Sequence, residues 1–290
     1  MKGEKPQGRG AKKGGGTMFE DIIKNVKAKT PLVHCITNYV TVNDVANILL
    51  ACGGSPIMAQ DAREAAEITA IADALYLNIG TLSEQSVKSM LISARAAEKK
   101  DIPVILDPVG AGASDFRTQS AKSILEAAPV AIIRGNVSEI MTLAGVKANT
   151  KGVDADAADM TRFSIDFLVD TAKSLARTSG AVVGISGKTD IATDGRRTVL
   201  IKNGHSDMSK ITGTGCMLTA VTAAYAGANP DRLLDALAAS FCAVGLAGQR
   251  ARERMVTENA GNASLRTWFI DNMYKMGYAD LKGGAKYEIY

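Results

Sequence analysis

Short apolar runs alternate along the chain with longer stretches in which apolar residues recur at helical spacing. The short runs are continuously apolar, which is typical of parallel strands that are buried on both faces of a sheet. We predict strands at residues 32–36, 56–59, 75–79, 104–107, 130–134, 181–186 and 198–202. Helices are predicted between them, for example at 42–52, 83–99 and 163–178. This alternation predicts an α/β fold with a largely parallel central sheet and helices on both faces, in which ligands bind beyond the carboxyl ends of the strands.

The pattern changes after Thr214, since from there to about Met276 it is helical almost throughout. No internal repeat and no linker interrupts residues 17–290, so we predict that they form a single domain. Residues 1–16 differ, because they are Gly-rich and contain five Lys or Arg and one Glu. We predict that these residues form a disordered basic tail.

The net charge of +4 comes from this tail, since the remaining residues carry equal numbers of basic and acidic side chains. We therefore expect no nucleic-acid partner. No run reaches the roughly 18 apolar residues of a membrane helix, so no membrane partner is expected either. The four cysteines are widely spaced, without a CxxC pair, and there are only two histidines. This usage disfavours zinc sites and disulfides, and it predicts a reducing, cytoplasmic location.

The four residues Gly213-Thr214-Gly215-Cys216 precede a long run of small apolar residues, which predicts the start of a buried helix. Two glycines let the backbone approach a ligand closely. Because the free N–H groups and the dipole of a helix N-terminus favour an anion, we predict an anion hole formed by Gly213, Thr214 and Gly215. Cys216 would then present a thiol to the bound anion. A purely structural turn is the alternative interpretation of these glycines.

Polar residues also stand at the ends of three predicted strands. Asp107 precedes a Gly-rich loop, where a carboxylate can bind a hydrated Mg²⁺ or cap a turn. Arg134 ends the next strand and offers a planar fork for phosphate oxygens. Asn136 and Glu139 have the spacing of a capping box, which would explain them without a ligand. Ser186 is a candidate for an adenosine pocket, although turn chemistry also accounts for it and for the hairpin predicted just after it.

Taken together, a carboxylate pair, an arginine and a helix-terminus anion hole suit phosphoryl transfer, which needs positioning, charge neutralisation and control of the acceptor's proton. Neither a GxxxxGK[ST] loop nor a GxGxxG strand–turn–helix element is present. An ATP site in this chain would therefore be of another type.

Five longer segments carry a further signal. They are PLVHCITNYVTVNDVANILLACGGSPIMA, LYLNIGTL, PVILDPVGAGAS, IIRGNVSEI and ITGTGCMLTAV, spread over about residues 30–228. With these segments the chain resembles the hydroxyethylthiazole kinases of thiamin biosynthesis and salvage, within the ribokinase-like superfamily. The resemblance implies ATP-dependent phosphorylation of the primary alcohol of 4-methyl-5-(2-hydroxyethyl)thiazole, with Mg²⁺. It also implies a homotrimer in which the first-strand and Met58 segments meet the Gly213–Cys216 tetrad of a neighbouring chain.

The resemblance assigns roles to individual residues. Substrate binding is implied for Asn38, Met58 and Gly213, ATP binding for Arg134 and Ser186, and Mg²⁺ binding, partly through water, for Asp107 and Glu139. A methionine such as Met58 is otherwise more often part of a core than a ligand contact. Cys216 stands where most ribokinase-like kinases carry an Asp as general base. We expect it to position the hydroxyl and accept its proton late, and since a helix N-terminus lowers a thiol pKa, we expect some thiolate at neutral pH.

Other activities stay open at this point. A ribokinase-like kinase of hydroxymethylpyrimidine or of a sugar is the nearest alternative, and a nucleotide-dependent dehydratase of the same fold is another. Both would be expected to carry Asp in place of Cys216. A binding protein that has lost catalysis is a third alternative, and a thiol hydrolase lacks a recognisable histidine partner. Residues 258–264 also depart from the family's Gly-Pro-Gly-rich turn, so we expect adenosine contacts near them to differ.

Overall fold

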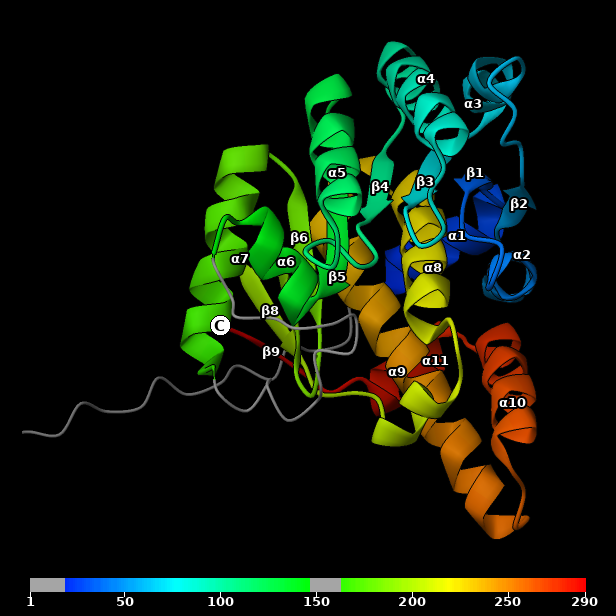
Figure 1. Cartoon of the computed structure of the whole chain (residues 1–290). Helices are drawn as coiled ribbons and strands as arrows, with labels where there is room; N and C mark the ends of the chain where they lie inside the picture. The colour runs from blue at the N-terminus through cyan, green and yellow to red at the C-terminus, as the bar shows by residue number, and fades with distance from the viewer. Residues whose placement is uncertain (1–18, 147–162) are drawn as a thin grey trace, which may run out of the picture.

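The computed structural model describes residues 19–146 and 163–290. Within these residues a nine-stranded sheet has the order β2-β1-β3-β4-β5-β6-β7-β8-β9 (Figure 1). Its strands are β1 (Leu32–Ile36), β2 (Ser55–Ile57), β3 (Ala74–Asn78), β4 (Val104–Asp107), β5 (Ile132–Asn136), β6 (Val182–Ser186), β7 (Asp190–Thr193), β8 (Thr198–Ile201) and β9 (Tyr287–Ile289). Neighbouring strands from β2 to β6 are parallel, and β7, β8 and β9 continue the sheet as antiparallel strands.

Helices cover both faces of this sheet. On one side lie α4 (Glu84–Lys100), α5 (Asp115–Ala127), α6 (Val137–Leu143) and α7 (Ile165–Ser179), with α3 (Ala65–Ile71) packed on α4. On the other lie α1 (Glu20–Lys29), α2 (Val42–Cys52), α8 (Thr214–Ala228), α9 (Leu233–Thr257), α10 (Asn262–Lys275) and α11 (Tyr278–Gly284). Two short 3₁₀ turns, Ser206–Lys210 and Pro230–Arg232, precede α8 and α9.

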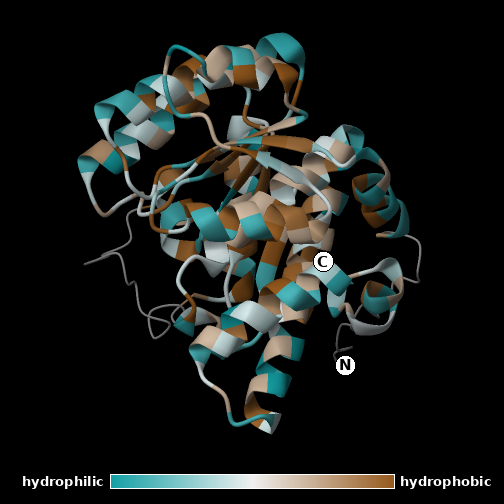
Figure 2. Cartoon of the chain, turned by 90° about the vertical axis from the view of Figure 1, so that its right-hand side faces the viewer, coloured by the Kyte–Doolittle hydropathy of each residue, from teal (hydrophilic) through white to brown (hydrophobic). Residues whose placement is uncertain are grey.

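Alternate residues of each strand enter two separate cores. In β3, Ala74 and Tyr76 pack on the α8 side of the sheet, whereas Leu75 and Leu77 pack on the α4 side. A strand that is covered on both faces must be apolar at every position, which is why the strand runs are continuous in the sequence. Figure 2 shows these apolar strands enclosed between helices whose hydrophilic residues face outward. The predicted α/β fold with a largely parallel sheet is therefore confirmed.

Most predicted elements lie where the sequence placed them, with two informative differences. The strand predicted at 130–134 begins at Ile132 and continues to Asn136, so Arg134 lies inside β5 and not at its end. The prediction contained no strand at β9, a three-residue element that pairs with β8 at the edge of the sheet. The hairpin predicted after Ser186 is formed by β7 and β8.

The structure does not test the predictions for the N-terminal tail and for the number of domains. The predicted tail, residues 1–16, lies outside the described residues. We keep the assignment of residues 17–290 to one domain as a prediction. In the two described ranges, no helix combines the length and the apolar character needed to cross a membrane.

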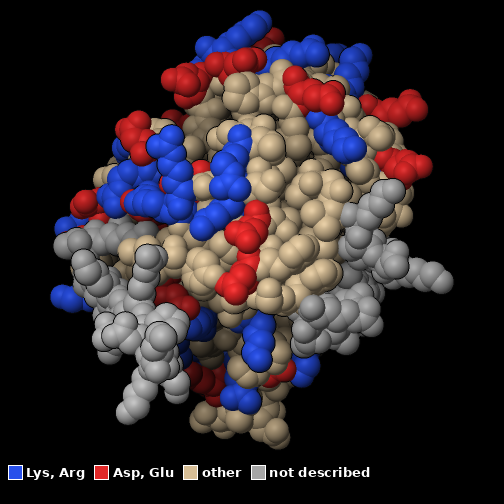
Figure 3. Space-filling model, turned by 90° about the vertical axis from the view of Figure 1, so that its left-hand side faces the viewer, with Lys and Arg blue, Asp and Glu red and all other residues tan. Residues whose placement is uncertain are grey.

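Charged side chains of both signs lie on the molecular surface on the side of α7, separated by uncharged areas (Figure 3). A few charged groups are buried instead. Asp107, Arg134 and Glu139 are each less than 8% exposed, and all three lie at or near the carboxyl ends of β4 and β5. Burying charged groups is costly unless they are paired, so this concentration at one edge of the sheet marks a candidate site.

Candidate active site

A cavity of about 210 Å³ opens between the carboxyl ends of β4 and β5 and the first turn of α8. Its walls are formed by Asp107, Val109, Arg134, Asn136, Glu139, Gly213, Thr214, Gly215 and Cys216. The structure thus brings together the predicted anion hole, the thiol, the arginine and the carboxylate pair. The segment between α9 and α10, which departs from the family pattern, does not line this cavity.

The first turn of α8 has the geometry of an anion site. Gly213 caps the helix with φ +83°, a left-handed conformation that favours glycine, and a Cβ there would lie 2.5 Å from Cγ2 of Thr41. The first intrahelical hydrogen bond runs from the N–H of Met217 to Gly213, so the preceding N–H groups have no helical acceptor. No acidic residue occupies this turn. These N–H groups are therefore available to an anion in the cavity.

Asp107 is held by three donors on one oxygen. Its Oδ2 accepts hydrogen bonds from Thr219 (2.9 Å), Asn78 (3.1 Å) and Tyr76 (3.4 Å). Nη1 of Arg134 lies 3.9 Å from the same oxygen. Burial raises the pKa of Asp107, and the nearby guanidinium acts in the opposite direction. The second oxygen, Oδ1, is buried and has no hydrogen-bond partner among the described residues.

Glu139 forms a capping box with Asn136, as the alternative interpretation predicted. Its Oε2 accepts the N–H of Asn136 (2.7 Å), and Oδ1 of Asn136 accepts the N–H of Glu139 (2.9 Å). The capping box leaves Oε1, which accepts the N–H of Gly110 (2.8 Å) in the loop after β4. Burial and the charge of Asp107 raise the pKa of Glu139. Glu139 is thus both a helix cap and one wall of the cavity.

These two carboxylates fit a hydrated Mg²⁺. The described part of the chain has no cluster of three or more His, Cys, Asp or Glu side chains arranged to hold a metal ion. Mg²⁺ does not need such a cluster, because it retains several waters and binds to one or two carboxylates together with phosphate oxygens. Asp107 lines the cavity, and its buried, unpartnered Oδ1 would be an oxygen ligand for such an ion.

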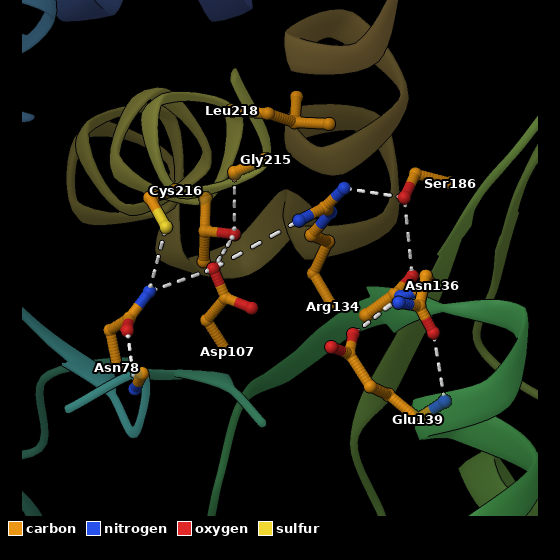
Figure 4. Close-up of polar contacts among 12 residues, drawn as sticks. Asn78, Asp107, Arg134, Asn136, Glu139, Ser186, Gly215, Cys216 and Leu218 are labelled. Carbon is orange, nitrogen blue, oxygen red and sulfur yellow. Dashed lines mark hydrogen bonds and ion pairs between the residues drawn. The ribbon is translucent and has the colours of Figure 1, made fainter. Parts of the chain in front are cut away.

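Arg134 points from β5 toward Ser186, and its Nη2 donates a hydrogen bond to Oγ of that residue (Figure 4). Its Nε is buried without a hydrogen-bond partner among the described residues. The α8 backbone comes very close to the guanidinium, because a Cβ on Gly215 would lie 2.9 Å from Nη1. The two residues predicted to contact ATP therefore lie side by side, with Arg134 lining the cavity and Ser186 behind it.

Cys216 sits at the centre of a polar network that reaches the end of β3 and the loop after β1. Its Sγ accepts hydrogen bonds from the side-chain amides of Asn78 (3.3 Å) and Asn38 (3.4 Å). Figure 4 shows Asn78 between Cys216 and Asp107, in contact with both. Burial and the charge of Asp107 raise the pKa of the Cys216 thiol. Both effects oppose the thiolate that a helix terminus favours, and some thiolate at neutral pH stays a prediction.

The first-strand segment meets the tetrad of its own chain. Asn38 lies after β1 and contacts Cys216 of the same chain directly, and the expected contact of this segment with a neighbouring subunit stays a prediction. Oδ1 of Asn38 also accepts the hydroxyl of Thr41 (3.0 Å), which packs on Gly213. Met58 follows β2, is 37% exposed and does not line the cavity. The structure thus brings Asn38, but not Met58, to the site within one chain.

Several residues of the network were not identified from the sequence. Asn78 ends β3 inside the segment LYLNIGTL, so its place at a strand end was a usable signal. Tyr76 and Thr219 carry no such signal. They are buried residues of an apolar strand and of a small-residue helix: the pairing of β3 with β4 brings Tyr76 to Asp107, and the packing of α8 on the sheet brings Thr219 there.

Comparison with known proteins places this site in a family. A model of the hydroxyethylthiazole kinase family matches residues 23–278. The chain belongs to the hydroxyethylthiazole kinase family. It is 48% identical over 274 residues to the hydroxyethylthiazole kinase of Clostridium acetobutylicum, an alignment that covers 94% of this chain and 100% of that protein. The predicted family is therefore confirmed, and the chain is a kinase.

Solved structures support the same assignment. A hydroxyethylthiazole kinase structure from Pyrococcus horikoshii OT3 matches with a TM-score of 0.82 and 33% identity, covering 93% of this chain and 98% of that one. A ribokinase-like superfamily protein from Enterococcus faecalis matches with a TM-score of 0.57 and 11% identity, covering 90% of this chain and 82% of that one. The second likeness shows the fold alone, which is the ribokinase-like α/β fold that was predicted.

Proposed function

We propose that this kinase transfers the γ-phosphoryl group of ATP to the primary alcohol of 4-methyl-5-(2-hydroxyethyl)thiazole, in thiamin biosynthesis or salvage. One observation carries the proposal. In a member of the hydroxyethylthiazole kinase family, a single cavity joins a helix N-terminus, the arginine of β5, two buried carboxylates and the Cys216 thiol. Phosphoryl transfer depends on positioning and on stabilising negative charge, and this cavity has groups for both tasks.

Different polar groups of the cavity bind ATP and the thiazole substrate. The N–H groups at the start of α8 bind oxygens of the transferring phosphoryl group, and Arg134, held by Ser186, binds phosphate oxygens of ATP. Mg²⁺, held by Asp107 and Glu139 in part through water, would neutralise charge on the phosphates. Asn38, Gly213 and Met58 contact the thiazole.

Cys216 handles the hydroxyl of the thiazole substrate. We propose that its sulfur positions the hydroxyl. Once the thiol has given its own proton to water, the thiolate accepts the hydroxyl proton late in the transfer without becoming phosphorylated. The amide N–H groups of Asn78 and Asn38 both point at the sulfur, where they stabilise negative charge when it forms. Because the transition state is loose, the oxygen of the acceptor needs little deprotonation before the phosphorus is transferred.

We further propose a homotrimer with sites at subunit interfaces, located in the cytoplasm. Tyr39 and Val40, which follow Asn38, are exposed apolar side chains, as is Met58. Such side chains beside a site are typical of a surface that another subunit covers. Met58 of one subunit would then reach the thiazole in the cavity of its neighbour. All four cysteines are free, as expected in a reducing compartment.

The activity test offers Mg²⁺ and ATP with hydroxyethylthiazole, hydroxymethylpyrimidine or ribose in separate reactions. We expect ADP release only with the thiazole, together with a thiazole product heavier by one phosphoryl group. Turnover with another acceptor, and none with the thiazole, would refute the proposed substrate. Light scattering of the purified protein tests the assembly, for which a monomer mass would contradict the trimer.

A further inference from the structure

Arg117 connects two loops of the active site without lining the cavity. It lies in the first turn of α5, which is capped by Ser114. Its Nη1 donates to the carbonyls of Ile79 (2.9 Å) and Val109 (2.7 Å), and its Nη2 donates to the carbonyl of Gly80 (2.8 Å). The first and third acceptors follow β3, whereas Val109 follows β4. One guanidinium group therefore joins the carboxyl ends of two neighbouring strands.

The two loops lead directly to the polar groups of the site. The N–H of Gly80 donates to Oδ1 of Asn78 (2.9 Å). The side-chain nitrogen of Asn78 in turn donates to Cys216 and to Asp107. On the other side, the N–H of Gly110, next to Val109, donates to Oε1 of Glu139 (2.8 Å). A continuous set of hydrogen bonds thus runs from Arg117 to the carboxylates proposed for Mg²⁺.

The contact depends on the shape of the arginine side chain. Gly110 adopts φ +74°, and a Cβ there would lie 3.1 Å from Cδ of Arg117, so the loop packs closely on this side chain. Arginine presents a rigid planar fork of donors, whereas a lysine has a single flexible ammonium group. A lysine at position 117 could therefore reach one loop but could not reproduce the three hydrogen bonds.

We propose that Arg117 is a positioning residue of this kinase, which fixes the loops after β3 and β4 so that Asp107 and Glu139 hold one arrangement toward the cavity. The inference rests on the proposed roles of these two carboxylates. Residues that orient metal ligands from behind commonly change metal affinity or activity by about 10- to 100-fold when they are replaced.

The test compares Arg117→Met and Arg117→Lys with a matched control, Arg177→Met. Arg177 of α7 also donates to a loop carbonyl, that of Gly195 (3.1 Å), and also packs on a glycine with positive φ, but its loop joins β7 to β8. Three measurements apply to each variant: the melting temperature, backbone amide exchange in the ligand-free protein, and binding of Mn²⁺ with ADP by electron paramagnetic resonance. Steady-state kinetics complete the set.

For Arg117→Met we expect faster amide exchange at residues 79–80 and 109–112, and Mn²⁺ binding weakened about 10- to 100-fold. The rate constant kcat should fall, with no change in the KM for the thiazole. For Arg117→Lys, kcat and Mn²⁺ affinity should lie between those of Arg117→Met and those of the wild type. Arg177→Met should leave metal binding and kcat at the wild-type values. The proposal is overturned if Arg117→Met matches Arg177→Met in exchange and metal binding. If Arg117→Met does not fold, Arg117→Lys is compared with Arg177→Met instead, and equal exchange and metal binding in these two variants would overturn the proposal.

A further variant separates this inference from the proposed function. Asp107→Asn should weaken Mn²⁺ binding in an otherwise wild-type chain. If it does not, the proposed metal role of Asp107 fails, whatever Arg117→Met does. If Asp107→Asn weakens binding and the Arg117 variants do not, the metal role stands and the positioning role of Arg117 fails.

Discussion

Replacement of Gly215 by alanine should lower activity without lowering stability. Gly215 is the second residue of α8, and its backbone is helical. Alanine is a better helix former than glycine by up to about 1 kcal/mol, so the backbone alone gains from the change. The new methyl group, however, would lie 2.9 Å from Nη1 of Arg134. The guanidinium is the end of a flexible side chain, so it should move and the helix should stay in place.

The size of the effect follows from the contact distance. Ordinary contacts between carbon atoms begin at about 3.5 Å, so the guanidinium must move by roughly 0.6 Å. That movement strains its hydrogen bond to Ser186 and its ion pair with Asp107. Because misplacement by about 1 Å can cost on the order of a hundredfold in rate, we expect a loss of about tenfold in kcat/KM for ATP. The melting temperature should be unchanged or rise by about 2 °C.

The assay pairs steady-state kinetics with thermal unfolding, and the control is Gly283→Ala. Gly283 lies in α11, where a Cβ would meet no atom within 4 Å. The control should therefore show the gain in helix stability with wild-type kinetics. Unchanged kcat/KM in Gly215→Ala would refute the close contact with Arg134. A large fall in melting temperature with normal kinetics would mean that the helix yields instead of the guanidinium.

Three further predictions concern buried polar groups. Asn78→Asp removes the donor 3.1 Å from Asp107 and adds a second acid beside it. The free energy of unfolding should therefore fall by about 2–4 kcal/mol in urea titrations. Unchanged stability would contradict the hydrogen bond between Asn78 and Asp107. Burial raises the pKa of Asp190 to about 7, so the unfolded chain loses this proton first and stability should fall as pH rises from 4 to 7. Asp190→Asn should make that slope shallower without abolishing it, because burial also raises the pKa values of Asp107 and Glu139, and a slope equal to the parent's would refute the assignment. Cys216→Asp should keep or raise kcat and Cys216→Ser should lower it, whereas a folded but inactive Cys216→Asp would show that Cys216 is not the base.

The sheet was predictable because its chemistry is local. Burial on both faces requires an apolar residue at every strand position, and that requirement is visible in any short window of sequence. The end of β5 was misplaced because this strand continues through Gly135 and Asn136, which look like a turn but pair in register with β6. β9 pairs with β8 at the edge of the sheet and needs little apolar surface, so it left no pattern to find.

The site was only partly predictable, for a different reason. Asp107 and Glu139 were found because parallel strands end at one edge, so polar residues at strand ends converge. The partners of Asp107 come from β3 and α8, and their convergence depends on the register between β3 and β4 and on how that helix packs. The same limit applies to the pKa of Cys216. The sequence reveals a helix terminus that lowers the pKa, but the burial and the charge of Asp107 that raise it exist only in the folded chain.

The raised pKa of Cys216 gives a physical reason for a thiol at this position. The cavity already contains two buried carboxylates whose pKa values are raised by burial, and ATP would add several negative charges. A third carboxylate would increase repulsion among these groups, whereas a protonated thiol is neutral while the nucleotide binds. A thiol is the weaker base at neutral pH, yet a loose transition state asks little of the base before the phosphoryl group has moved. The amides of Asn78 and Asn38 stabilise the thiolate that forms when the thiol gives its proton to water, before the sulfur accepts the proton of the hydroxyl. A cysteine at this position is therefore a weaker base than an aspartate would be, but it repels the nucleotide less.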